Sequence, residues 1–225
     1  FICWRRNHSD APTGRYEQEK DRIPVRQIAE VDLAEMHKAY SVLELYDRPT
    51  LMAAQVGKPV YVEKPMARNY AECLEMLKVS EETGMPLRVA YHKKILEAYA
   101  KVKELIEAGV IGKPLMANIK LYKPAPERNH GKDEMSWHVF PEISGGGHFF
   151  DLGCHQLDYL DFLFGPITSV SGKAYNKAGL YPAEDTVTGI WEHESGVTGT
   201  GSWCFVVDES LKKDEIEITG ERGKL

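Results

Sequence analysis

The sequence has no features that suggest a membrane span, a secreted leader or a nucleic-acid surface. None of its 225 residues belong to an apolar run long enough to cross a bilayer. The opening residues, FICWRRNHSD, lack the basic, apolar and small-residue order of a signal peptide. The net charge is −6 and there is no long basic run, so we expect neither a membrane nor nucleic acid as a partner.

Cysteine is scarce, and the cysteines present are scattered. The sequence contains four of them and no C-x-x-C pair: Cys3, Cys73, Cys154 and Cys204. Such spacing argues against a disulfide framework and against a zinc site of the C-x-x-C type, and it predicts a cytoplasmic protein. Four histidines invite a metal interpretation, but their spacing fits no compact ligand motif, so we expect no metal: His130, His138, His148 and His155.

Two different patterns of elements divide the chain. The first part alternates expected strands (1–4, 23–25, 41–46, 58–63 and 87–90) with expected helices (32–40, 49–56 and 70–83). This rhythm predicts a parallel sheet with helical crossovers. Within it, the run KPVYVE at 58–63 is typical of a strand buried on both faces. Asn69, with Glu72 three residues on, predicts a capped helix start, and Gly84 predicts its end.

The second part changes to long strands after a helix at 95–108. We expect strands at 115–122, 167–175, 186–193, 197–207 and 215–219, with a hairpin at Glu194-Ser195-Gly196. The predicted fold is therefore α/β followed by α+β, with a largely antiparallel open sheet in the second part. We place the domain boundary between residues 92 and 93, which gives domains of 1–92 and 93–225.

The most informative stretch is residues 145–165, GGGHFFDLGCHQLDYLDFLFG. Three glycines end what we expect to be an extended segment, and an amphipathic helix follows. Asp151 and His155 are four residues apart, which places them on one face of an α-helix about one turn apart. A carboxylate beside an imidazole can transfer protons. The alternative is an ordinary helix with an acidic first turn and a half-buried histidine.

Lys64 provides the second chemical feature. It follows the strand at 58–63, and ligands of open α/β sheets bind beyond the carboxyl ends of the strands. A lysine there can stabilise negative charge on an oxygen. Taken alone, the tripeptide Glu63-Lys64-Pro65 is a weak signal, and an ordinary solvated lysine at a strand end is the better interpretation of it.

Together these stretches resemble the Gfo/Idh/MocA (glucose-fructose oxidoreductase/inositol dehydrogenase) family. VEKPMA at 62–67 is similar to one family signature, and the glycine triplet followed by D-x-G-x-H at 151–155 is similar to the second. The segment KVKELIEAGVIGKPL at 101–115 and the position of Trp137 also fit. The resemblance runs from about residue 57 to residue 225.

The resemblance implies a nicotinamide-dependent oxidoreductase that acts on a sugar, polyol or related diol. It implies that Lys64 lies by the nicotinamide and the reacting oxygen, flanked by the cofactor-binding residues Glu63 and Pro65. It also implies that His155 exchanges the hydroxyl proton and that Asp151 binds the substrate or orients the histidine. Lys93 and Trp137 complete the substrate-binding residues that we expect.

The cofactor is expected to be NAD or NADP. The resemblance places residues 1–4 at the family's second strand, after which Arg5 and Arg6 would meet the adenosine ribose and favour NADP. A solvated basic pair is an equally good interpretation of the two arginines. The family's G-x-G-x-x-G loop is not found in the sequence, so we expect the first domain to be an incomplete Rossmann-like dinucleotide-binding domain.

Two alternatives therefore accompany the enzyme interpretation. One is a non-catalytic fragment, or a binding protein of the same fold, that lacks the phosphate-binding loop and looks incomplete at both ends. The other is a module that binds sugars or partners through the antiparallel sheet. With either, the sheet predicts self-association as a homodimer or homotetramer.

Overall fold

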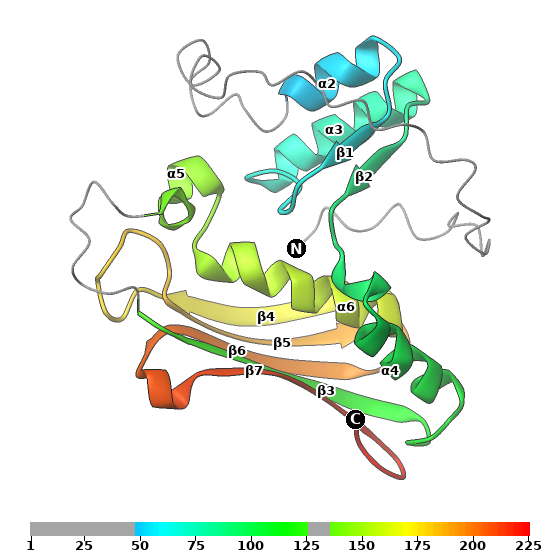
Figure 1. Cartoon of the computed structure of the whole chain (residues 1–225), viewed down its shortest axis with the longest axis vertical. Helices are drawn as coiled ribbons and strands as arrows, with labels where there is room; N and C mark the ends of the chain where they lie inside the picture. The colour runs from blue at the N-terminus through cyan, green and yellow to red at the C-terminus, as the bar shows by residue number, and fades with distance from the viewer. Residues whose placement is uncertain (1–47, 126–135) are drawn as a thin grey trace.

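The computed structural model describes residues 48–125 and 136–225, which form two connected parts (Figure 1). The first part contains the elements α2 (Arg48–Gln55), β1 (Val60–Val62), α3 (Tyr70–Thr83) and β2 (Leu87–Val89). β1 and β2 are parallel, as predicted, with Val60 opposite Leu87. The elements expected at 1–4, 23–25, 32–40 and 41–46 lie outside the described residues.

One face of this small sheet is covered and the other is not. Val60 and Val62 pack toward a cluster that includes Met66, Cys73 and Met76 from the segment after β1 and from α3. Tyr61 points the other way and keeps 71% of its surface exposed. The prediction that β1 is buried on both faces is therefore wrong, because successive side chains alternate between faces and the described helices supply only one cover.

Helix α3 begins and ends at the residues that the sequence indicates. The Asn69 side chain accepts a hydrogen bond from the Glu72 backbone N–H at 3.1 Å, and Gly84 ends the helix with a left-handed φ of 67°. In a standard capping box the Glu72 side chain would accept from the backbone N–H of the N-cap residue, Asn69. Here it reaches one residue further back, to Arg68. Its carboxylate accepts from the Arg68 backbone N–H at 3.0 Å and pairs with the Arg68 guanidinium.

The second part is a helix-covered sheet. Its elements are α4 (Glu97–Glu107), β3 (Pro114–Pro124), α5 (Pro141–Ser144), α6 (Cys154–Phe164), β4 (Ile167–Tyr175), β5 (Thr186–His193), β6 (Thr198–Val207) and β7 (Lys213–Gly220). Within the described ranges the sheet has five strands in the order β4-β5-β6-β3-β7. β3 runs parallel to β6, and the other pairings are antiparallel, so the sheet is largely antiparallel as predicted.

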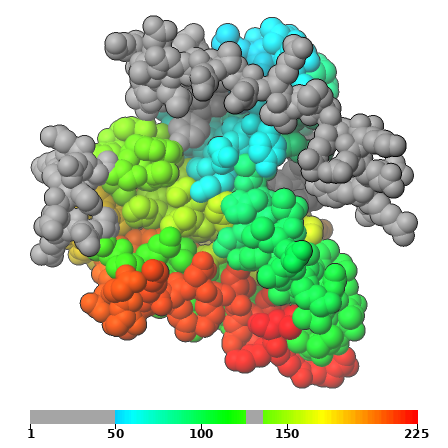
Figure 2. All heavy atoms as spheres, viewed as in Figure 1, coloured from blue at the N-terminus to red at the C-terminus, as the bar shows by residue number. Residues whose placement is uncertain are grey.

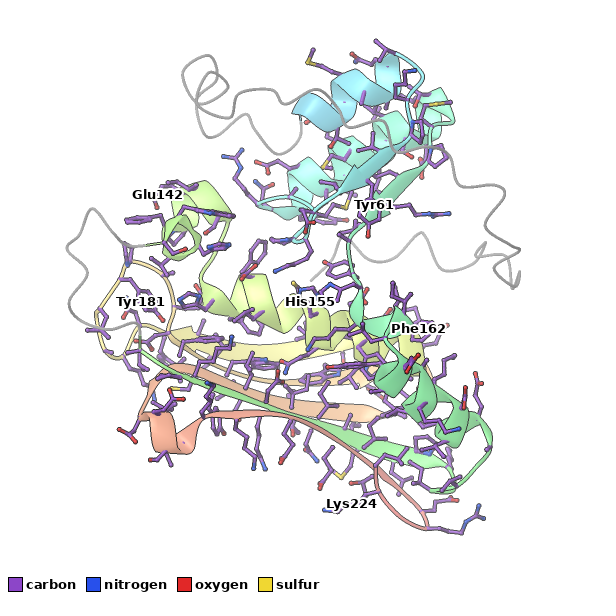
Figure 3. The ribbon with its side chains drawn as sticks, in the orientation of Figure 1. Tyr61, Glu142, His155, Phe162, Tyr181 and Lys224 are labelled. Carbon is purple, nitrogen blue, oxygen red and sulfur yellow. The ribbon has the colours of Figure 1, made fainter. Side chains whose placement is uncertain are left out.

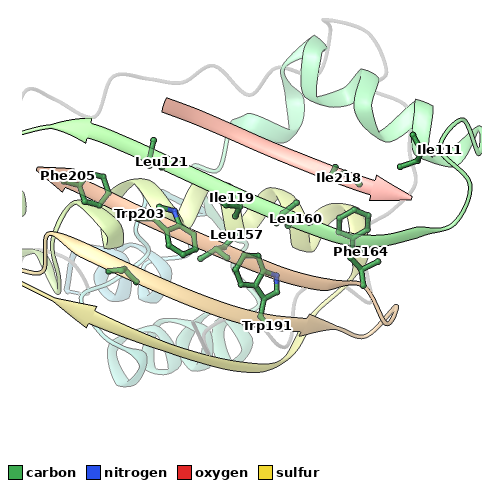
Figure 4. Close-up of a cluster of buried hydrophobic side chains, with 13 residues drawn as sticks. Ile111, Ile119, Leu121, Leu157, Leu160, Phe164, Trp191, Trp203, Phe205 and Ile218 are labelled. Carbon is green, nitrogen blue, oxygen red and sulfur yellow. The ribbon is translucent and has the colours of Figure 1, made fainter. Parts of the chain in front are cut away.

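The core of this part lies between α6 and the sheet (Figure 4). Trp191 and Trp203 lie over the inner face of β5 and β6, where a side chain on Gly199 or Gly201 would overlap their rings. Leu157, Leu160 and Phe164 of α6 belong to the same cluster. The apolar helix face predicted from the sequence therefore docks on the sheet. Trp203 also donates its indole N–H to Gln156 Oε1 at 2.8 Å, which satisfies the oxygen of this buried amide.

The two parts meet at the segment that contains α5 and α6. In the space-filling view the yellow-green segment lies between the cyan first part and the orange strand β7 (Figure 2). The chain passes from β2 to α4 through a 3₁₀ turn, Lys93–Ile95, which packs against α6. This passage coincides with the predicted domain boundary, which stays a prediction. Among the described helices, none has the length and apolar content that a bilayer crossing requires.

Candidate functional site

Glycines allow the segment before α6 to pass close to the segment after β1. Gly145 has a φ of 86°, and a Cβ on it would overlap the backbone of Arg68. Gly147 donates its backbone N–H to Glu184 Oε1 at 2.8 Å, and a Cβ there would lie 2.8 Å from the Ala183 Cβ. The triplet follows the short helix α5 rather than the extended segment that we predicted, because Pro141 begins a helical turn that Gly145 ends.

A π-helical turn, Phe149–Gly153, carries Asp151 and leads into α6, which carries His155. The prediction of one regular α-helix through both residues is wrong at this point. A π-turn contains an extra residue, so the angular spacing from Asp151 to His155 differs from the one-turn spacing of an α-helix. Such turns often occur at functional sites, where they redirect a side chain.

Lys64 and Asp151 form the central contact of the site. Lys64 Nζ lies 2.5 Å from Asp151 Oδ1 and 3.1 Å from the Asp151 backbone oxygen. The side chains are 18% and 19% exposed, so the ion pair is shielded yet open on one side. Lys64 reaches this position from the loop after β1, at the cis peptide bond to Pro65. The two sequence motifs therefore meet, although 87 residues separate them.

His155 lies buried beside this pair with an unsatisfied ring nitrogen. It is 6% exposed, and Nδ1 has no hydrogen-bond partner among the described residues. Its ring meets the His92 ring edge-on at a centroid distance of 5.0 Å and the Tyr91 ring at 6.0 Å. Figure 3 shows His155 on the side of α6 that faces the chain descending from β2. An orphaned nitrogen in such a place can accept a hydrogen bond or a proton from a ligand.

The surroundings favour the neutral imidazole. Burial lowers the pKa of His155 to about 4, helped by the positive charges of Lys64, His92 and Lys93 and opposed by Asp151. Burial disfavours the charged form, and nearby cations act in the same direction. At neutral pH His155 is therefore a proton acceptor. Because the Lys64 charge contributes to this lowering of the His155 pKa, the Lys64 ammonium lies near the His155 imidazole.

Cys154 hydrogen-bonds to the Asp151 backbone, but its thiol is not a nucleophile. Its thiol donates to the Asp151 backbone oxygen at 3.1 Å, so the same carbonyl accepts from Cys154 and from Lys64. Burial raises the pKa of the Cys154 thiol to about 12. The thiol therefore stays protonated at neutral pH, which excludes thiolate chemistry there.

Sequence reasoning did not single out Asp158, which lies three residues after His155. Its carboxylate is 3% exposed and receives the Lys94 ammonium at 3.3 Å, while Oδ2 has no hydrogen-bond partner in the described part of the chain. Burial raises its pKa to about 6, although Lys94 opposes the shift. The available signal was the spacing, since residues three apart share a helix face.

The other expected site residues lie around this centre at different distances. Glu63 is exposed and Pro65 is buried on either side of Lys64. Lys93 lies with Nζ 5.5 Å from the centre of the Tyr99 ring, and its charge acts on His155. Trp137 occupies a 3₁₀ turn before α5, 45% exposed, with its ring stacked on His138 at 3.7 Å. These roles stay predictions.

Some expectations cannot be placed. Arg5, Arg6 and His130 lie outside the described residues. In the ranges 48–125 and 136–225, no group of three or more histidine, cysteine or acidic side chains is arranged to hold a metal ion.

A cavity of about 520 Å³ lies beside the centre, between α3, α6 and the start of β4. It is largely apolar and shares Pro65, Tyr91 and Cys154 with the surroundings of the site. Lys64, Asp151 and His155 are not among its lining residues. The cavity is therefore a neighbour of the catalytic candidates and not the space in which they meet.

Comparisons with known proteins agree with this architecture. Residues 99–225 match the family model described as the GFO/IDH/MocA C-terminal domain. Oxidoreductase P35 of Formosa agariphila is 35% identical over 175 residues, which cover 78% of this chain and 53% of that protein. The 1,5-anhydro-D-fructose reductase of Ensifer adhaerens is 28% identical over 184 residues, which cover 81% of this chain and 53% of that enzyme.

A solved structure shows the same arrangement. The WlbA dehydrogenase from Bordetella pertussis, in complex with NADH and UDP-GlcNAcA, superposes with a TM-score of 0.71 at 28% identity. The match covers 80% of this chain and 55% of that one. The chain thus spans about half the length of the relatives it matches.

Proposed function

We propose that this chain, which belongs to the Gfo/Idh/MocA family, carries the catalytic centre of an NAD(P)-dependent oxidoreductase that acts on a sugar, polyol or related diol. The observation that carries the proposal is the 2.5 Å contact between Lys64 and Asp151 beside the buried, neutral His155. An ammonium, a carboxylate and an imidazole from separate elements share one small space there. This is the set of groups that the oxidation of an alcohol or the reduction of a carbonyl requires.

The residues at the carboxyl end of β1 fit the reactive end of a nicotinamide. Lys64 and Pro65 lie where ligands of parallel sheets bind, and the unpartnered His155 Nδ1 provides a polar atom ready for a ligand. A bound nicotinamide would supply the hydride acceptor or donor. We propose either NAD or NADP, with Arg5 and Arg6 as the reason to favour NADP, and Glu63 and Pro65 beside the ring.

The protein's own part in the reaction is proton transfer and charge stabilisation. In the oxidation direction, neutral His155 takes the proton of the substrate hydroxyl while the carbon loses its hydride. Lys64 stabilises the negative charge that develops on the oxygen, and Asp151 holds the Lys64 ammonium in place. In the reduction direction, His155 passes to the oxygen a proton that it first takes up from solvent. Lys93 and Trp137 are proposed to bind other parts of the substrate.

The relatives point to the substrate class. One acts, by its name, as a 1,5-anhydro-D-fructose reductase, and the WlbA structure holds a nucleotide-linked sugar with NADH. We propose a sugar or polyol substrate for this protein too, and a cytoplasmic location.

The outer face of the sheet supports self-association. Ile190 (59% exposed) and Met116 (38% exposed) lie on the face turned away from α6, among paired polar side chains such as Tyr122 with Ser202. We propose a homodimer or homotetramer through this face. Sedimentation that shows only monomer at micromolar concentration would contradict it.

The test of the function begins with cofactor binding. NADH and NADPH are titrated separately into the protein, and nicotinamide fluorescence is followed. Saturable enhancement with either nucleotide, followed by turnover at 340 nm with members of a sugar and polyol panel, is the expected result. No binding of either nucleotide would favour a non-catalytic protein of the same fold.

A further inference from the structure

One stripe of α6 holds the passage from β2 to α4 against the catalytic helix. The stripe consists of His155, Asp158 and Phe162, at spacings of three and four, which share one helix face. Figure 3 shows His155 and Phe162 on the side of α6 next to this passage. Residues 91–94, which we name the crossover segment, contact all three members of the stripe, and Lys103 of α4 also lies 4.7 Å from the centre of the Phe162 ring.

All three members of the stripe contact the crossover segment, and Lys94 contacts two of them. The Tyr91 and His92 rings lie edge-on to the His155 ring. The Lys94 ammonium donates to Asp158 Oδ1 at 3.3 Å and lies 6.0 Å from the centre of the Phe162 ring. The contacts between the rings include no hydrogen bond, so the rings can shift against each other. The ion pair instead holds the Lys94 ammonium at one oxygen of Asp158. Among the described residues, Lys94 and Asp158 form the one ion pair between this segment and the stripe.

We propose that Lys94 and Asp158 are positioning residues that fix the crossover segment, so that His92 and Tyr91 keep His155 buried and aimed at the reacting oxygen. The inference deepens the proposed function and rests on it, because it takes His155 as the proton-transferring group. Asp158 is 3% exposed and half of its carboxylate is unpaired, which is costly for a residue with no task beyond stability.

The accessibility of His155 to an imidazole reagent at pH 7.5 reports this positioning directly. At this pH Asp158, with a pKa of about 6, is ionised and pairs with Lys94. His155, with a pKa of about 4, is neutral, and even the ordinary histidine value of about 6.5 would leave it mostly neutral. Faster modification of His155 after substitution of Lys94 or Asp158 therefore reports movement of the crossover segment, and not a change in the charge of the imidazole.

The experiment treats the protein, without cofactor or substrate, with diethyl pyrocarbonate at pH 7.5 and follows modification of the His155-containing peptide by mass spectrometry. In the wild type we expect slow modification, because His155 is buried. Lys94→Met and Asp158→Asn should each speed it several-fold. Lys94→Arg keeps the cation and should retain the slow rate.

The matched control is Lys101→Met, which removes an exposed α4 lysine whose partner is Glu104. It should leave the rate of His155 modification unchanged. If Lys94→Met fails to fold because Asp158 is left unpaired, the double variant Lys94→Met/Asp158→Asn removes both charges and carries the test, with the same faster modification expected.

A wild-type rate of His155 modification in the folded Lys94→Met, Asp158→Asn or double variant would overturn the inference. Because the measurement uses no substrate, it separates the two proposals. Absence of turnover with every sugar in the wild type would contradict the function alone. Wild-type protection of His155 in the variants would contradict the positioning role alone.

Discussion

The Lys64 ammonium and the Asp151 carboxylate lie 2.5 Å apart, and this contact joins the first part of the chain to the second. Lys64 comes from the loop after a parallel strand, and Asp151 comes from a π-helical turn that precedes the helix over the second sheet. Neither side chain forms such a shielded ion pair without the other. Their pairing beside His155 creates a shielded site with a fixed cation and a neutral base, which suits the proposed transfer of a hydride from or to an alcohol carbon.

The burial of His155 predicts a specific pH dependence of stability. The pKa is about 4 in the folded chain and about 6.5 when the chain unfolds, so between these values the unfolded state binds the proton and the folded state does not. The contribution of the neutral His155 to the free energy of unfolding is fully present above pH 6.5 and decreases as the pH falls below that value. Between pH 7.5 and pH 5 the loss should be about 2 kcal/mol.

Urea unfolding of the wild type and His155→Gln at the two pH values checks this expectation. The variant should lose about 2 kcal/mol less than the wild type on acidification. Asp158 and Asp161 have raised pKa values of about 6 and about 7 and act in the opposite sense, but they are present in both proteins and cancel in the comparison. The control His138→Gln should follow the wild type. Identical pH slopes for wild type and His155→Gln would rule out the buried neutral imidazole.

The tryptophan layer of the core makes a second prediction. A methyl group at Gly201 would overlap the Trp203 ring, so Gly201→Ala should cost about 1–3 kcal/mol of unfolding free energy. Gly189 lies on the same face, but the nearest atom to an added Cβ there is the Ser171 oxygen at 3.6 Å. Gly189→Ala is therefore the matched control, and its stability should stay close to that of the wild type. Equal stabilities of the two variants would show that the rings are not packed on Gly201.

Short-range sequence patterns predicted most of the helices and strands. They did not predict contacts between residues that lie far apart in the sequence. The Asn69 cap and the hairpin at 194–196 are each indicated by residues close together in the sequence, and both are present in the structure. The exposure of Tyr61, the π-turn at Asp151 and the Lys94–Asp158 pair depend on what packs against each segment. The last joins residues 64 apart in sequence. The resemblance suggested Lys64, Asp151 and His155 as candidate site residues, whereas the contacts of the crossover segment with His155 became visible only in the structure.

The start of α3 offers a third prediction. The Asn69 side chain satisfies the Glu72 N–H, so Asn69→Ala should lower stability by about 1 kcal/mol. Asn69→Ser retains a capping oxygen and should lie close to the wild type. Urea midpoints measured side by side decide the matter. An Ala variant as stable as the Ser variant would mean that the cap contributes nothing.

The central claim is that Lys64 and His155 act on the same substrate oxygen, and single-turnover hydride transfer tests it most directly. Absorbance at 340 nm is followed in the cofactor-loaded protein with the best substrate from the sugar and polyol panel, for the wild type, Lys64→Met and His155→Asn. Lys58→Met, an exposed lysine six residues before Lys64, is the control. We predict that each site variant lowers the rate by at least about 100-fold while folding normally, and that the control does not. Wild-type rates in a folded Lys64→Met or His155→Asn variant would contradict the account.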